Sequence, residues 1–227
     1  MARKARTTQI SQGIVDLLYP ITIIGAFMIT VCLPLLLTLL LLKPSFIAIG
    51  LWWLFLMPLG PAAIAALAAI GEYARVKVPG LYRHAWRFMQ RNFREGLRIW
   101  SPVWVFTLPL MLYSRVQLAA GPRWLYFLLP ALILGGLFVA ILMLTIWPIA
   151  ATFTFKTSDY WRLAIAGLAN HKMILFANAI IALVGLCIEA WVSPLLLIIL
   201  ASCLLVPLYY LNTPLLDWIK TNFTNNH

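Results

Sequence analysis

Few side chains in this sequence have the chemistry of a catalytic or ligand-binding group, and those few lie mostly at the edges of long apolar runs. The acids are Asp16, Glu72, Glu95, Asp159, Glu189 and Asp217, and the histidines are His84, His171 and His227. The sequence has no His-Glu-x-x-His zinc motif, no phosphate-binding Gly-x-x-x-x-Gly-Lys loop and no Gly-x-Ser-x-Gly nucleophile motif. It therefore predicts a protein that is not an enzyme and that binds no cofactor or metal.

Two polar side chains, Asn178 and Glu189, fall inside one apolar run. An ionisable group within a membrane span is a functional-site hypothesis by default. Glu189, however, lies next to Trp191 near the end of the run, where its carboxylate can reach the membrane interface or pair with another group. We expect Asn178, which lies deeper, to make a helix–helix hydrogen bond rather than to bind substrate.

The composition indicates that lipid is the solvent of this chain. Of its 227 residues, 63% are hydrophobic and 10% are charged, whereas soluble domains average about 45–50% and about 25%. Six apolar runs approach or exceed the roughly 20 residues that a helix needs to cross about 30 Å of hydrocarbon. The predicted spans are 21–42, 46–70, 99–118, 124–147, 173–191 and 194–212.

The basic residues indicate the orientation. Fourteen of the 17 lysines and arginines lie on the N-terminal tail, on the connections after the second and fourth spans, and on the C-terminal tail. The positive-inside rule then places both termini in the cytoplasm. The net charge of +11 is explained by this topology and by attraction to anionic lipid headgroups, so nucleic acid is not an expected partner.

Each pair of predicted spans follows a segment with helical patterning, and these segments are residues 7–20, 81–98 and 158–172. We therefore expect one all-α membrane domain over residues 1–227. Its six transmembrane helices would form three hairpins, each preceded by a cytoplasmic interfacial helix.

The middle segment has the clearest two-faced pattern. At 100° per residue, its five arginines fall within about 80° of one another, and aromatic and small residues lie opposite. The arginines are Arg83, Arg87, Arg91, Arg94 and Arg98. Such a helix either lies flat on the membrane, where each basic group contributes on the order of 1 kcal/mol, or docks in a groove of a partner protein.

Gly60 and Pro61 interrupt the second span. Proline removes a backbone hydrogen bond and glycine allows close approach, so we expect a kink or a tight helix crossing there. The alanine-rich residues 62–69 would let a neighbouring helix pack closely. A hinge in a moving transporter is the alternative interpretation.

Three short motifs resemble the YesL-like family of small bacterial integral membrane proteins, whose domain has no assigned function. Gly60-Pro61-Ala62 resembles its first motif, Asn92-Phe93-Arg94 the second, and the residues from Pro148 to Phe153 the third. The resemblance implies an integral protein of the bacterial cytoplasmic membrane. It also implies an accessory role beside a carbohydrate importer of the ABC type, whose permease subunits would be partners. The alternative is an independent small-solute transporter or channel, which would need a polar path through the helices.

Overall fold

The computed structural model describes residues 2–43, 45–77, 80–118, 125–191 and 194–224, and this part of the chain is helical throughout, apart from short connections. The predicted all-α fold is therefore confirmed for the described residues. The helices are α1 (Ala2–Leu41), α2 (Phe46–Phe55), α3 (Leu59–Val76), α4 (Leu81–Leu118), α5 (Leu125–Thr152), α6 (Thr157–Asn170), α7 (Lys172–Trp191), α8 (Pro194–Ile219) and the π-helix η1 (Lys220–Thr224).

Several of these helices are long and apolar enough to cross a membrane. Within the described residues, three stretches meet this condition, and the bent pair α6–α7 makes up to four. The three stretches are Leu18–Leu41, Phe46–Val76 and Leu134–Thr152. The chain thus has the character of a membrane protein, but these residues do not support the expected six spans in three hairpins. Predicted spans 99–118, 124–147, 173–191 and 194–212 all include side chains outside the described residues.

The predicted interfacial segments are not all separate helices. Residues 7–20 and 21–41 belong to the single helix α1, and residues 81–98 continue directly into the rest of α4. The prediction of separate helices was wrong here because no residue ends the helix at either junction: both Pro20 and Pro102 are accommodated inside a helix. A separate helix forms only in the third case, where α6 ends and α7 begins after a 108° bend.

The second predicted span is broken into α2 and α3. The break occupies residues 56–58, immediately before the Gly60-Pro61 pair at which a kink was expected. Because Pro58 has no N–H, it cannot bond to the Leu54 carbonyl. The N–H of Met57 takes that carbonyl instead, at 3.1 Å, in a tighter turn.

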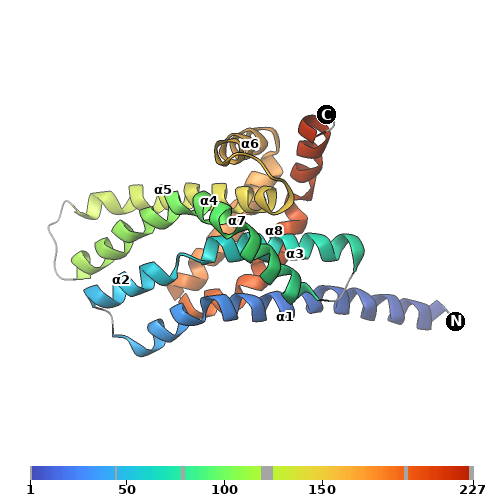
Figure 1. Cartoon of the computed structure of the whole chain (residues 1–227), viewed down its shortest axis with the longest axis horizontal. Coiled ribbons are helices and arrows are strands. Elements are labelled where there is room, and N and C mark those ends of the chain that lie inside the picture. Colours follow the sequence, from blue (N-terminus) through green and yellow to red (C-terminus); the bar gives the residue numbers. More distant parts are fainter. Residues whose placement is uncertain (1, 44, 78–79, 119–124, 192–193, 225–227) are drawn as a thin grey trace.

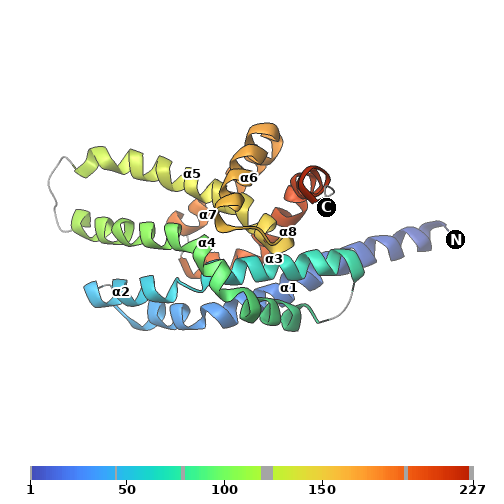
Figure 2. The same cartoon turned by 45° about the horizontal axis from the view of Figure 1, so that its top comes forward.

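The helix α3 lies at the centre of the bundle. Every residue from 60 to 71 is buried, and α3 packs against α1, α4, α5 and α8. Figures 1 and 2 show the first half of α4 crossing α3 obliquely before α4 turns to run between α2 and α5. In both views α6 lies transverse to α5. The alanine-rich sequence of α3 explains how so many neighbours approach it.

Candidate functional site at the crossing of α3 and α4

The first half of α4 has one buried and one exposed face, as its sequence pattern predicts. Leu81, Ala85, Gly96 and Ile99 are buried against other helices of the same chain. The five arginines are all exposed. Much of the face opposite the arginines therefore packs against the protein's own core, although Tyr82 and Trp86 stay partly exposed, and the arginine face is free to meet lipid or a partner.

Two glycines make the crossing of α3 and α4 close. A Cβ atom on Gly60 would collide with the ring of Trp100, and one on Gly96 would lie 3.1 Å from the Cα atom of Pro61. The tight crossing expected at Gly60 and Pro61 is thus confirmed. Ala62, the next residue of that motif, is fully buried in α3.

Tryptophans of α4 supply hydrogen bonds to the break between α2 and α3. The Trp104 indole N–H donates to the Trp53 carbonyl at 2.7 Å, and the Trp53 indole N–H donates to the Trp104 carbonyl at 2.8 Å. Their rings stack 4.1 Å apart. The Trp100 indole N–H donates to the Leu56 carbonyl at 3.3 Å. The Trp53 and Leu56 carbonyls also accept the backbone N–H groups of Leu56 and Leu59, at 3.3 and 3.2 Å, so the indole bonds add a second donor to each carbonyl at the break.

Tyr160 of α6 joins this crossing to the third predicted amphipathic segment, residues 158–172. The Tyr160 hydroxyl lies 2.9 Å from Glu95 Oε1 and 2.9 Å from the Phe153 carbonyl oxygen, and it accepts from the Phe155 N–H at 3.0 Å. A hydroxyl has one hydrogen, so it donates to one of the two oxygens at a time. Burial, assisted by the nearby Glu95, raises the pKa of Tyr160 to about 12. The phenol therefore stays neutral at physiological pH.

A small cavity of about 90 Å³ lies where α3, α4 and α5 meet. Its lining includes Pro61, Asn92, Glu95, Gly96 and Phe153. The three motifs of the family resemblance, far apart in sequence, are thus neighbours in space. A space of this size holds a few water molecules, so the cavity is suited to hydration of the crossing rather than to a sugar.

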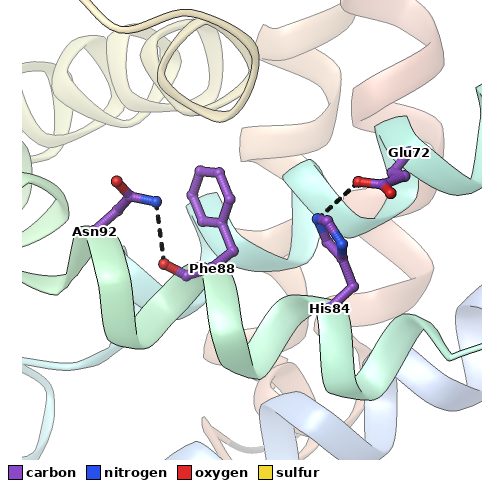
Figure 3. Close-up of polar contacts among 4 residues, drawn as sticks. All are labelled: Glu72, His84, Phe88 and Asn92. Carbon is purple, nitrogen blue, oxygen red and sulfur yellow. Dashed lines mark hydrogen bonds and ion pairs between the residues drawn. The ribbon is translucent and has the colours of Figure 1, made fainter.

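Polar side chains continue along α4 toward its start. Figure 3 shows His84, Phe88 and Asn92 on one face of α4, with Glu72 of α3 opposite His84. His84 Nε2 lies 3.1 Å from Glu72 Oε2, and the Asn92 amide donates to the Phe88 carbonyl at 3.2 Å. Both partners of the first pair are partly exposed, so it stabilises the fold by at most about 1 kcal/mol.

The arginine face carries the strongest chemical signal at this site. Within the described part of the chain, none of its five guanidinium groups is paired with a carboxylate. Guanidinium groups bind phosphate and carboxylate oxygens through two parallel hydrogen bonds. A row of them on a fixed helix can therefore bind lipid phosphates or the acidic surface of a protein.

A second polar cluster lies inside the bundle. The Asn178 amide donates to Thr145 Oγ1 at 2.9 Å and to Asn212 Oδ1 at 3.3 Å, and the Asn212 amide donates to Asn178 Oδ1 at 3.1 Å. All three residues are fully buried, and they come from α5, α7 and α8. The expected helix–helix role of Asn178 is confirmed.

The predicted site residues thus divide into several groups. Gly60, Pro61, Ala62 and Asn92 gather at the crossing, Phe93 is half-buried on α4, and the arginines lie on the outer face. Asn178 belongs to the separate cluster in the bundle. Glu189 belongs to α7, but its side chain lies outside the described residues.

Several residues of these sites were not anticipated. They are Glu95, Gly96, Tyr160, Thr145 and Asn212. Asn212 lies in an apolar run, as Asn178 does, and this position could have indicated a buried hydrogen-bonding role for Asn212. Nothing in the sequence indicated the pairing of Glu95 with Tyr160, 65 residues away.

Comparison with known proteins gives no match for this chain among protein-family models, curated proteins or solved structures. The likeness to the YesL-like family therefore stays a prediction.

Proposed function

We propose that this chain is a YesL-like, six-span protein of the bacterial cytoplasmic membrane, with both termini in the cytoplasm. It acts as a non-enzymatic accessory component of carbohydrate uptake and binds permease subunits of an ABC importer. The observation that carries the proposal is the arginine face of α4, which is exposed along its whole length while the opposite face is held against α3. Such a surface suits an acidic region of a cytoplasmic partner, with anionic headgroups beside it.

The rigidity of this surface supports docking over simple anchoring. A helix that only anchors topology can lie loosely on lipid. The first half of α4 is instead fixed by the Gly60–Trp100 and Gly96–Pro61 contacts and by the Glu95–Tyr160 hydrogen bond. A preorganised surface loses less conformational entropy when it binds.

The interior favours an accessory role over independent transport. Among the described residues, the buried polar side chains are Thr145, Asn178, Ser202 and Asn212, and three of these hydrogen-bond to one another. Broken helices in transporters often leave backbone groups free to bind substrate or ions. Here, the Trp53 and Leu56 carbonyls at the break are occupied by indole N–H groups.

Co-purification from native membranes tests the proposal. The chain is extracted with its surrounding lipid in polymer nanodiscs, and associated importer subunits are identified by mass spectrometry. We expect Arg87→Gln/Arg91→Gln/Arg94→Gln to lose the permease about tenfold or more, because hydrogen bonds to charged groups contribute about 1.5–3 kcal/mol each.

The matched control removes three positive charges elsewhere. Arg3→Gln/Lys4→Gln/Arg6→Gln changes the start of α1 and should keep the permease at the wild-type level. Absence of the permease from the wild-type preparation would contradict the proposal, as would equal loss in both triple variants.

A further inference from the structure

A second surface, distinct from the arginine face, lies where α6, α7 and α8 meet. It is a groove of about 700 Å³ that begins at Asn170, His171 and Lys172 and continues along α7 toward Ile181. Leu211 of α8 lines its other wall. The described lining residues include one lysine and no acid.

The end of the groove at the α6–α7 bend is polar and cationic. Lys172 is exposed there. The N–H groups of Ile174 and Leu175 both donate to the His171 carbonyl, whereas the amides of Lys172 and Met173 precede any acceptor within α7. The His171 ring packs edge-on against Trp218, and its Nε2 atom is buried without a hydrogen-bond partner in the described structure.

The rest of the groove is apolar and opens on the outer surface of the bundle. Met173 and Phe176 are 81% and 65% exposed, and Ile180 is also exposed. Ile181 comes nine positions after Lys172 in α7, which corresponds to about 14 Å along the helix. That is close to half of the roughly 30 Å hydrocarbon core, or the depth of one leaflet.

We propose that this groove binds one anionic glycerophospholipid from the leaflet at the α6–α7 bend. The phosphate lies at Lys172 and the first amides of α7, beside His171, and an acyl chain lies along α7 against Leu211. A lipid fits better than a soluble anion because the polar end of the groove continues into an apolar part that is exposed to the membrane. The inference rests on the membrane placement of the proposed function but not on the importer partner.

Native mass spectrometry of the full chain tests this site. The protein is reconstituted in nanodiscs with equal amounts of palmitoyl-oleoyl phosphatidylglycerol and phosphatidylcholine, and retained lipid is counted after release. We expect the wild type to keep one phosphatidylglycerol. Lys172→Gln should retain about fivefold less, the loss expected for one basic side chain beside anionic lipid, and Lys172→Arg should retain the wild-type amount.

Lys156→Gln is the matched control for charge. Lys156 is exposed at the other end of α6 and lies outside the groove, so this variant should bind as the wild type does. Equal retention of the two lipids by the wild type would overturn the proposal, and so would equal losses in Lys156→Gln and Lys172→Gln.

A second pair of variants tests the apolar part of the groove. Ala177→Trp fills it and should abolish phosphatidylglycerol retention, whereas Leu183→Trp places the same ring at an exposed position of α7 outside the groove. Retention unchanged in Ala177→Trp would overturn the acyl-chain assignment. Displacement of the bound lipid by millimolar sn-glycerol 1-phosphate would show a small-anion site and overturn the lipid assignment. No importer is present, so failure of the accessory role would leave these results unchanged.

Discussion

The two amphipathic segments at 81–98 and 157–170 share a plan but continue differently into the apolar helices that follow them. The first runs without interruption into the rest of α4. The second ends at Asn170, and the chain turns by 108° into α7. The uninterrupted helix packs its inner face against α3 and exposes its five arginines, whereas a groove lined by His171 and Lys172 lies at the bend.

The difference arises from how each segment meets its neighbour. Gly96 faces the backbone of Pro61, which cannot move aside, and Trp100 then fixes the next turn. Gly167 of α6 faces the end of the Leu215 side chain, which can rotate. The first half of α4, which is continuous and packs against backbone, is therefore a rigid surface. The bend between α6 and α7, where the contact is with a side chain, leaves a surface that can accept a ligand.

The largest effect is expected from a substitution that disrupts the close crossing of α3 and α4. Gly60→Ala places a methyl group against the Trp100 ring, which is held by its bond to Leu56. We expect a loss of about 3 kcal/mol, at the upper end for overpacking. The measurement is the thermal unfolding midpoint in detergent. Gly50→Ala, at a position with open space, should leave the midpoint unchanged or raise it. Equal midpoints for both variants would show that the crossing is loose.

A smaller effect is expected from the polar cluster of the C-terminal helices. Asn178→Ala removes the partner of Thr145 and Asn212 and leaves buried polar groups unpaired, at a cost of about 2 kcal/mol. Chemical denaturation in mild detergent measures this loss. Asn222→Ala, at an exposed position, serves as the control. A tolerated Asn178→Ala would show that the cluster does not clamp α5, α7 and α8 together.

The link between the two segments can be weakened by Tyr160→Phe. The change removes the hydrogen bond to Glu95 and leaves the Phe155 N–H unpaired, at a cost of about 1.5 kcal/mol. Hydrogen–deuterium exchange should then rise at residues 153–160 and around Glu95. Tyr210→Phe, at a half-exposed ring, should change neither region. Unchanged exchange in Tyr160→Phe would show that α6 and α4 are held by apolar packing alone.

The smallest effect is expected at the exposed pair that joins His84 of α4 to Glu72 of α3. His84→Ala removes the contact with Glu72, and because both groups are partly exposed, we expect less than about 0.5 kcal/mol. The midpoint in detergent should therefore match that of Lys156→Gln within error. A loss comparable to that of Tyr160→Phe would make this pair part of the structural core.

The sequence predicted what depends on local patterns. The all-helical character, the two faces of residues 81–98, the close approach at Gly60 and the hydrogen bonding of Asn178 follow from periodicity, residue size and the cost of burying a polar group in an apolar helix. The break was expected near Gly60-Pro61 and lies a few residues earlier, because Pro58 is the first residue that cannot donate a backbone bond.

What could not be predicted depends on contacts between distant residues. The Trp53–Trp104 pair joins positions 51 residues apart, and Glu95 and Tyr160 are 65 apart. The separation of residues 7–20 and 81–98 as independent helices was wrong, since amphipathic patterning shows where a face changes and not where a helix ends. The end of α6 was marked only by a change in pattern at residues 170–172.

The most direct test of the account is cysteine labelling of the first half of α4 in a variant whose three native cysteines are replaced by alanine. Arg91→Cys should react with a membrane-impermeant maleimide in inside-out vesicles and stay unlabelled in right-side-out vesicles, while Ala85→Cys on the buried face should react in neither. Labelling of Arg91→Cys from the outside, or equal labelling of the two positions, would contradict a rigid arginine face presented to the cytoplasm.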